Sequence, residues 1–509
     1  MLHEGARMRF IVSGLNRAIE LLFSIRQGDP IAMLLYILYI EPLLIALEKR
    51  ITGLQVAGIG KSLEAYCDDV NVVTDNLEDL DVVSEVVGKF EKVSGAISSR
   101  NKKCKVIGFG NWAGKEDWPL AWIKPVKSEK IFGIFICDSY EELLEFNWNH
   151  RYQKLSNTVY SWSNRVLDTL QQRVEVIRVF SISRVYYVAS VLPMKPGVVK
   201  KFEKLMGKYL WNFSGKILRV AINEMKKRKL EGGLNLPCIA SMADALLLSQ
   251  FVRLIRSGDK KTLGHAHYWL SGILETLVPD VVHGQQRAAE TTNYFLHIAN
   301  LALDMMVRET LTIGTIKNLT NKVIYREMTS SFPPPKVVME SDLDYGVPWR
   351  RLHSTVVDIK ARDIMFLLMH NKLPVQERLF RIRLKPDPYC IRCAQAEIND
   401  IVHFFCKCEA VSNTWSWLKR QVVRLGQIGP NVADWDIINL FFPTSRHDRE
   451  IIWMVSTYVL YVWETVHDKK KEVELNKFFG FLTFKFKMHQ TNLLGLDRVL
   501  CQPLNLHYT

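Results

Sequence analysis

The sequence predicts an α+β fold for the first part of the chain and a mostly helical remainder. A helical run follows a Gly-Asp-Pro break, and two short strand-like runs flank Tyr66-Cys67-Asp68-Asp69. This order is typical of helices packed on one side of a small antiparallel sheet. From Trp148 onward apolar residues recur at helical spacing, and Cys and His gather late in the chain. At 509 residues the chain has room for roughly three domains of about 150 residues each.

The composition is that of a basic globular protein. Hydrophobic residues make up 48% and charged residues 24%, so the chain can bury substantial cores. The net charge of +14 favours a polyanionic partner, since neutralised phosphates release counterions. A basic surface also attracts membranes, so charge alone does not identify the partner. Glu4, Arg7 and Arg9 interrupt the first ten residues, which therefore do not read as a signal peptide, and we expect an intracellular protein.

The first helix is predicted over residues 31–50. Pro30 lies where proline starts helices, and Gly53 marks the end. The apolar run Ile31–Leu47 is interrupted by Glu41-Pro42 and falls short of the roughly 20 residues that a membrane span needs. We therefore expect no membrane contact and a helix that is buried on most sides.

A β-hairpin is predicted at Tyr66-Cys67-Asp68-Asp69, between strands over residues 61–65 and 70–74. Two adjacent carboxylates then lie at an exposed, well-supported tip. Mg²⁺ prefers such oxygen ligands alongside substrate phosphates, and phosphoryl transfer uses such ions. Adjacent Asp residues are also common in ordinary turns, so a solvated turn is the alternative interpretation.

An amphipathic helix is predicted after the hairpin, with Gly95 as its stop. Its apolar positions follow helical spacing, which directs the intervening acidic residues mostly outward. These acidic residues are Asp79, Asp81 and Glu85. Strands are predicted at residues 106–109 and 131–136. Helices are predicted over residues 170–192 and from residue 198 to 213, and Ser330–Pro335 reads as a linker.

A zinc site is predicted from the pattern Cys390-x2-Cys393-x9-His403-x4-Cys408. Thiolates and an imidazole suit tetrahedral Zn²⁺, and the two-residue knuckle is the most specific part of the pattern. Cys406 competes with Cys408 for the fourth position, and unmetallated buried cysteines are the alternative interpretation. Basic residues surround the pattern, which suggests contact with RNA or DNA. They are Arg381, Arg383, Lys385, Arg392 and Lys407.

The order of the early motifs resembles the palm of a reverse transcriptase, specifically that of non-LTR (LINE-type) retrotransposons. Arg26-Gln27-Gly28, the hairpin Tyr66–Asp69, Ser94-Gly95 with a following Lys, and Phe132-Gly133 occur in the order of that family. Later, Trp211, the Gly232–Pro237 segment and the Cys/His pattern match markers that follow the palm. The resemblance spans most of the chain and is loose over residues 260–340.

The resemblance implies roles for individual residues. Asp68 and Asp69 would be catalytic and hold Mg²⁺ or Mn²⁺ while a primer 3′-hydroxyl attacks the α-phosphate of a deoxynucleotide triphosphate. The implied nucleotide- and template-binding residues are Arg26, Gln27, Gly28, Tyr66 and Lys102. The implied primer grip is Phe132 and Gly133. Cys390, Cys393, His403 and Cys408 would bind Zn²⁺. The implied partners are an element RNA template and a DNA primer or target, and the implied location is cytoplasmic and nuclear.

The chain also departs from the family pattern. That family carries a first catalytic Asp on a strand before the Arg-Gln-Gly motif, and here no Asp precedes Asp29. Ser99 stands where relatives usually have Asn. We therefore expect a truncated, catalytically incomplete copy that retains nucleic-acid binding. The alternative is a non-enzymatic nucleic-acid-binding remnant of a retroelement. A group II intron-type maturase is disfavoured by the Gly232–Pro237 segment and the late zinc pattern.

The expected domains follow from these assignments. We predict a partial palm over residues 1–140, a thumb with the following Gly-Gly-Leu segment over 141–257, and a helical connector over 258–340. A helical hairpin with the zinc-binding region would occupy 341–420, and a helical region 421–509. The sequence leaves the oligomeric state open.

Overall fold

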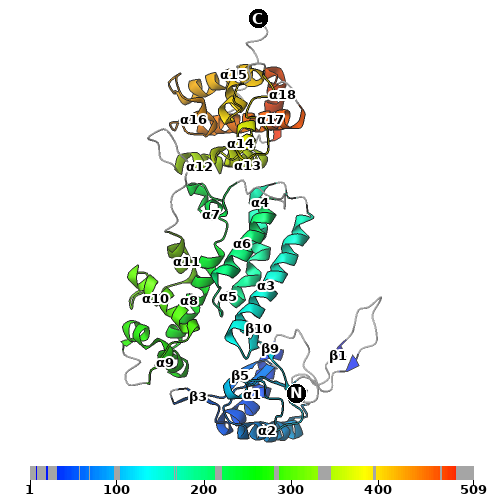
Figure 1. Ribbon diagram of the computed structural model, residues 1–509, viewed down its shortest axis with the longest axis vertical. Coiled ribbons are helices and arrows are strands. Elements are labelled where there is room, and N and C mark those ends of the chain that lie inside the picture. The colour runs from blue at the N-terminus through cyan, green and yellow to red at the C-terminus, as the bar shows by residue number, and fades with distance from the viewer. Residues whose placement is uncertain are drawn as a thin grey trace. The chain divides into compact units, whose positions relative to one another are not determined.

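The computed structural model describes most of the chain, with gaps. The described residues are 7–8, 19–20, 31–56, 58–67, 69–96, 104–165, 167, 169–211, 220–258, 260–279, 286–330, 346–393, 397–469 and 473–488. They belong to two compact units (Figure 1). Unit 1 comprises Met1–His150, Val191–Pro193 and Leu247–Asn321, and unit 2 comprises Arg151–Ser190, Met194–Leu246 and Lys322–Thr509.

The first part of unit 1 packs two helices against a hairpin. The elements are α1 (Ala32–Arg50), β5 (Leu63–Tyr66), β6 (Asp69–Val72) and α2 (Glu78–Ser94). Leu43 and Leu47 of α1 and Val86 of α2 are buried together, and hairpin residues such as Val70 pack on them. This confirms an α+β arrangement with both helices against the hairpin. Gly95 ends α2 with φ 70°, as its sequence position predicts.

The sheet differs from the single small sheet that the sequence suggests. The described strands pair two by two: β1 (Arg7–Met8) with β2 (Ile19–Glu20), β3 (Leu54–Val56) with β4 (Ile59–Lys61), β5 with β6, β7 (Lys105–Val106) with β8 (Lys124–Pro125), and β9 (Ser128–Ile131) with β10 (Ile134–Cys137). The β7–β8 pair is parallel and the others are antiparallel. The short 3₁₀ helix η1 (Gly110–Trp112) follows β7.

Two expectations for the helices of unit 1 are wrong. Helix α1 is not buried on most sides, because Leu34 and Leu38 are 63% and 70% exposed and Leu43 and Leu47 are its buried positions. Asp79 does not face outward but is only 3% exposed. Its carboxylate accepts hydrogen bonds from backbone amides that follow α1, which lie too far along the chain for helical spacing to reveal.

Unit 1 is completed by helices that come later in the chain. They are α9 (Lys260–Leu277) and α10 (Asn293–Val307), and α8 (Ile239–Ser257) contributes its second half. His265 of α9 lies 3.1 Å from the carbonyl oxygen of Ile59 in β4, which ties α9 to the strands. None of the helices described is long and apolar enough to cross a bilayer.

Unit 2 begins with the last part of α3 (Tyr140–Ser163) and continues as a helical layer. The following elements are α4 (Leu170–Val176), the π-helix η2 (Ile177–Ser181), α5 (Ser183–Ala189) and α6 (Pro196–Leu210). The helix predicted over residues 170–192 is therefore interrupted by a π-turn. Pro196 occupies the first turn of α6, where its missing N–H leaves no broken hydrogen bond. Helix α7 (Ile222–Lys226) and the 3₁₀ helix η3 (Lys229–Glu231) lead to Gly232.

The Gly232-Gly233 pair is shaped by close approaches that no side chain would permit. Gly232 has φ 80°, and a Cβ on it would lie 2.8 Å from the ring of Trp349. A Cβ on Gly233 would lie 1.9 Å from the carbonyl oxygen of Lys227. His370 Nε2 lies 2.7 Å from the carbonyl oxygen of Gly232, to which it donates. The two glycines therefore let Trp349 and His370, which precede the cysteine cluster in the chain, pack closely against this turn.

The C-terminal part of unit 2 is a helical assembly built around α17 (Asp448–Lys469) (Figure 1). Helix α11 (Asn321–Ser330) lies outside this assembly, and the hydroxyl of its Tyr325 accepts a hydrogen bond from the backbone amide of Cys238. The other elements of the assembly are α12 (Gly346–Leu352), α13 (Ile359–Met369), α14 (Gln376–Arg381), the π-helix η5 (His403–Lys407), α15 (Glu409–Gly426), α16 (Asp434–Ile438) and α18 (Leu475–Met488). Every residue from Ile451 to Val462 is buried, so α17 forms the centre of this core.

Candidate metal centre

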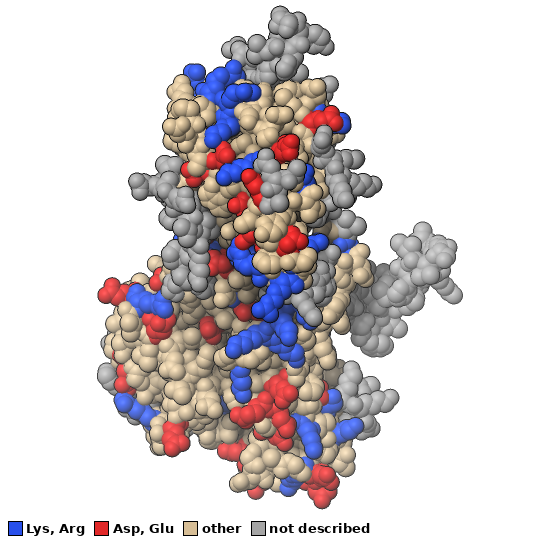
Figure 2. Space-filling model, turned by 45° about the horizontal axis from the view of Figure 1, so that its top comes forward, with Lys and Arg blue, Asp and Glu red and all other residues tan. Residues whose placement is uncertain are grey.

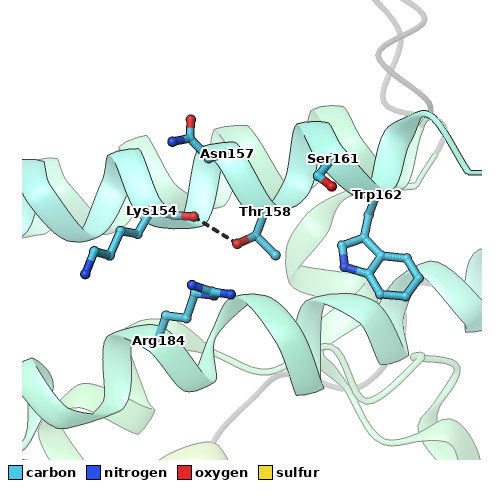
Figure 3. A pocket seen from close by; sticks show the side chains of 6 residues that line it. All are labelled: Lys154, Asn157, Thr158, Ser161, Trp162 and Arg184. Carbon is cyan, nitrogen blue, oxygen red and sulfur yellow. Dashed lines mark hydrogen bonds between the residues drawn. The ribbon is translucent and has the colours of Figure 1, made fainter. Parts of the chain in front are cut away.

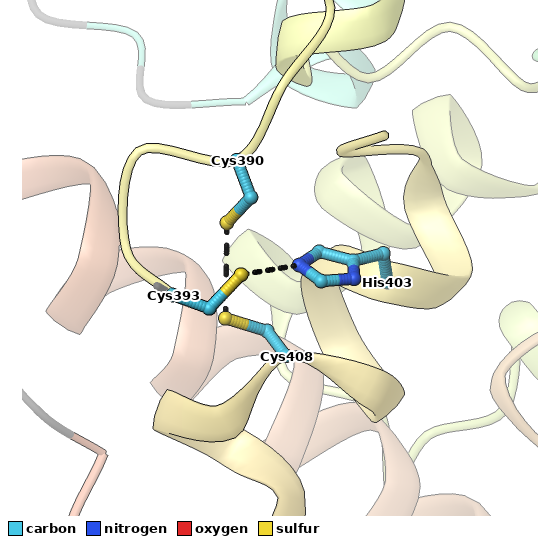
Figure 4. A group of neighbouring side chains, drawn as sticks. All are labelled: Cys390, Cys393, His403 and Cys408. Carbon is cyan, nitrogen blue, oxygen red and sulfur yellow. Dashed lines mark hydrogen bonds between the residues drawn. The ribbon is translucent and has the colours of Figure 1, made fainter. Parts of the chain in front are cut away.

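Four side chains from separate local structures meet beside α15. Cys390 and Cys393 lie on a loop that a β-bridge between Tyr389 and Ile398 closes. His403 opens the π-helix η5, and Cys408 is the N-cap residue of α15. The structure thus brings together the four residues that the sequence spacing selects (Figure 4).

The distances between the ligand atoms fit a tetrahedral metal site. The Sγ atoms of Cys390 and Cys408 lie 3.8 Å apart, and Cys393 Sγ lies 3.5 Å from His403 Nε2. Zinc with Zn–S bonds of about 2.3 Å and Zn–N bonds of about 2.0 Å places two sulfurs about 3.8 Å apart and a sulfur and nitrogen about 3.5 Å apart. All four atoms lie within 4.8 Å of one another, so one ion can reach them all. The donor set and the spacing both support zinc binding.

The remaining ring nitrogen of His403 is held by a carboxylate. His403 Nδ1 lies 2.8 Å from Glu397 Oε2, and the backbone amide of His403 donates to Asp400 Oδ1. A carboxylate on Nδ1 fixes the tautomer that leaves the Nε2 lone pair for a metal. Sequence reasoning missed Glu397, whose signal was its place as one of two acidic residues, with Asp400, between the second Cys and the His.

The thiols of the cluster differ in acidity. Burial raises the pKa of Cys390, but hydrogen bonds from the amides of Arg392 and Cys393 outweigh it and bring the pKa down to about 7. Burial, with the neighbouring Cys390, raises the pKa of Cys408 to about 11. Of these two thiols, Cys390 therefore supplies a thiolate to an arriving cation more readily than Cys408. Burial raises the pKa of Cys406 as well, and Cys406 is not a member of the cluster.

The cluster is anchored to the helical core around it. Arg392 stacks its guanidinium 4.3 Å from the ring centroid of Phe404 and donates to that residue's carbonyl oxygen. The hydroxyl of Tyr458, in the buried centre of α17, donates to the carbonyl oxygen of Phe405. The metal-binding loop therefore belongs to a larger helical body and is not an independent finger.

The hairpin in unit 1 is the second candidate site. Tyr66 pairs with Asp69 across β5 and β6, and Cys67 has φ 53°, so the chain reverses in a tight two-residue turn. This confirms the predicted hairpin. The ring of Tyr66, 71% exposed, lies edge-on to Phe132 with centroids 6.2 Å apart. Two of the residues assigned by resemblance, one to nucleotide binding and one to the primer grip, thus lie together.

Other predicted residues are placed differently or lie outside the described part. Phe132 and Gly133 form the turn between β9 and β10, with φ 46° and 85°, and not the predicted strand over residues 131–136. Because apolar residues stand on both sides of this turn, the sequence pattern does not show that the strand is interrupted there. The residues outside the described part are Arg26, Gln27, Gly28, Asp68 and Lys102.

Comparisons with known proteins bear on the metal centre and on the chain as a whole. The family described as zinc-binding in reverse transcriptase matches residues 338–415, which include all four cluster residues. The Transposon TX1 uncharacterized 149 kDa protein of Xenopus laevis is 26% identical over 242 residues, covering 45% of this chain. The aligned part spans 18% of the length of that relative.

Proposed function

Because this chain is related to the reverse transcriptases of non-LTR retrotransposons, we propose that it is a LINE-type element protein that binds nucleic acid. The observation that carries this proposal is the Cys390/Cys393/His403/Cys408 cluster, whose interatomic distances fit zinc, within a segment similar to the zinc-binding region of reverse transcriptases. The net charge of +14 supports a polyanionic partner. Lys and Arg gather in several groups on the face shown in Figure 2.

Zinc would act here as a structural cross-link. Three thiolates and one imidazole complete a tetrahedron and leave no open position for a reacting water or substrate. Cys390 and Cys393 would be fastened to the start of α15 through Cys408. That fastening fixes the exposed edge of the loop, where Tyr389 and Ile391 face solvent. Exposed cations lie close by in sequence, namely Arg383, Lys385 and Lys407. Aromatic rings and cations together suit unpaired RNA or DNA.

The hairpin supports a polymerase role for the reverse-transcriptase domain of which it would be a part. Asp69 starts β6 at the end of a tight turn and is exposed, so its carboxylate is available to a Mg²⁺ or Mn²⁺ ion. With Asp68 it would hold the metal while an RNA template, a DNA primer and deoxynucleotide triphosphates meet there. No Asp precedes Asp29, so we propose that these 509 residues bind nucleic acid without catalysing extension.

The test is nucleic-acid binding by the zinc-loaded chain and two variants. Cys390→Ser should remove zinc and weaken binding to labelled RNA and DNA by about tenfold, as loss of a structural metal frees the loop. Cys406→Ala, a cysteine outside the cluster, should leave zinc content and affinity unchanged. Unaltered protein that binds neither RNA nor DNA would refute the proposed function. Cys390→Ser protein that binds as tightly as the unaltered chain would refute the role of the metal.

A further inference from the structure

A groove in unit 2 combines cations, small polar groups and an aromatic ring. It is lined by Lys154, Asn157, Thr158, Ser161 and Trp162 of α3 and by Arg184 of α5, with a volume of about 370 Å³. Figure 3 shows Trp162 pointing from α3 toward α5 and Arg184 pointing back toward α3. No sequence motif marked this groove, because its two walls meet only in the folded chain.

The cationic end of the groove can hold phosphates. Among the residues that the structure describes, neither Lys154 nor Arg184 forms an ion pair with a carboxylate. Arg184 donates its Nε to the carbonyl oxygen of Phe180, which fixes the guanidinium at the groove wall. The Thr158 hydroxyl donates its proton to the carbonyl oxygen of Lys154 and has none left for a phosphate, whereas exposed Asn157 offers an amide donor. Such groups bind the phosphate and sugar of a strand in a sequence-independent way.

The other end of the groove is aromatic. The rings of Trp162 and Phe180 lie 4.8 Å apart at an interplanar angle of 31°, and the guanidinium of Arg165 lies 4.4 Å from the Trp162 centroid. Phe180 belongs to the π-helix η2 and remains 46% exposed. A π-turn shifts helical side chains out of register, and such turns are frequent at functional sites. The exposed Phe180 ring of this tilted pair offers a flat surface to an unpaired base.

We propose that the α3–α5 groove binds a single strand of nucleic acid, with phosphates at Lys154 and Arg184 and a base on the Trp162–Phe180 pair. Trp162 lies eight residues after Lys154, a distance of about 12 Å along the helix, so one short strand segment can reach both ends. A duplex keeps its bases stacked inside and cannot use the aromatic end. This inference rests on the proposed nucleic-acid-binding function but concerns residues other than the zinc cluster.

The test compares full-length, zinc-loaded variants by fluorescence anisotropy with labelled oligo-U, oligo-dT and a duplex of equal length. Lys154→Gln/Arg184→Gln should weaken single-strand binding about tenfold and reduce the salt-dependence slope by about 1.4, since each single-strand phosphate contact contributes about 0.7. Lys204→Gln/Lys208→Gln on α6 removes the same charge outside the groove and should change the affinity by less than about threefold.

A second pair of variants tests stacking. Phe180→Leu should weaken single-strand binding about tenfold, whereas Phe180→Tyr, which keeps the ring, should preserve it. Loss confined to oligo-U assigns the ligand as RNA, and loss confined to oligo-dT assigns it as DNA. Unchanged single-strand binding in both the cation and the leucine variants, or an equal loss for the duplex, would overturn the groove. Unaltered protein that binds none of the three probes would instead refute the proposed function.

Discussion

At the scale of single residues, the metal centre depends on a carboxylate that is not itself a ligand. Glu397 holds Nδ1 of His403 at 2.8 Å while Nε2 faces Cys393. Without that partner the imidazole can rotate or adopt the tautomer that protonates Nε2. The ring would then lose its role as a fourth ligand for part of the time.

Glu397→Gln should therefore weaken zinc affinity by about 10- to 100-fold while the three thiols remain in place. Competition with a chromophoric chelator measures this change. Glu409→Gln provides the control, because Glu409 is an exposed carboxylate in the first turn of α15. Equal zinc affinities for Glu397→Gln and the unaltered protein would show that His403 is oriented by its backbone alone.

Asp79 is a second residue whose role lies in its hydrogen bonds. Its carboxylate accepts from the Thr52 and Gly53 amides and from the Thr74 hydroxyl, at 3.1, 3.0 and 2.6 Å. Burial acts to raise its pKa, but these hydrogen bonds lower it below the ordinary value. The loop after α1 is thereby tied to the chain that leaves the hairpin.

Asp79→Ala should destabilise the α1–hairpin region by about 2–3 kcal/mol, because it strands donors to a charged acceptor. The exposed Asp81→Ala should cost less than about 0.5 kcal/mol. Hydrogen exchange of the amides of residues 52–74 measures the difference. Since the folded-state pKa is depressed, the stabilisation by Asp79 is present above the unfolded-state value and is lost as the pH falls through the folded-state value. Equal exchange in both variants would contradict this role.

At the scale of elements, residues of α12 and the end of α13 pack against the Gly232-Gly233 turn that follows η3. Trp349 is fully buried against Gly232, and His370 donates to the same glycine's carbonyl oxygen. Asp363 of α13 accepts from the Leu170 amide at the start of α4. Burial raises the pKa of Asp363 to about 6. Within unit 2, α12 and α13 thus contact elements that come much earlier in the chain, namely the glycine turn and the start of α4.

Gly232→Ala should lower stability by about 2–4 kcal/mol, from a left-handed φ and a collision with the Trp349 ring. Gly197→Ala is the matched control. Its added methyl meets nothing within 4 Å in α6, so it should stabilise the helix by about 0.5 kcal/mol. Thermal unfolding of the two variants measures both effects. A Gly232→Ala protein that melts with the unaltered chain would show that Trp349 yields readily.

The elements also show how far the sequence can be interpreted. The hairpin, the end of α2 at Gly95 and the Cys/His group were predictable, because turn chemistry and ligand spacing are local signals. The burial of Asp79 was not, since its amide partners lie 26 and 27 residues away in the chain. The α3–α5 groove was hidden for the same reason. The turn at Phe132 was hidden because an apolar residue there reads as strand.

At the scale of the whole molecule, relationship to reverse transcriptases does not by itself imply catalysis by these residues. The sequence supplies two adjacent carboxylates, Asp68 and Asp69, but two-metal phosphoryl transfer needs enough ligands to hold ions at both the attacking and the leaving oxygens. No Asp lies before the Arg-Gln-Gly motif to complete the set. We therefore expect nucleic-acid binding without extension from these 509 residues.

A primer-extension assay of the chain with Mg²⁺ or Mn²⁺ should give no product above background, because two hairpin carboxylates alone would position the metals poorly. Asp68→Asn and the nearby Asp75→Asn should both match the unaltered chain. Robust extension that Asp68→Asn abolishes and Asp75→Asn spares would show that the chain is a competent polymerase.

The central claim is that Cys390, Cys393, His403 and Cys408 together bind one zinc ion. X-ray absorption at the zinc edge, with metal content measured on the same purified chain, tests it most directly. We predict one zinc per chain, with three sulfurs at about 2.3 Å and one nitrogen at about 2.0 Å. A chain that retains no zinc, or a shell of oxygen and nitrogen without sulfur, would contradict the account.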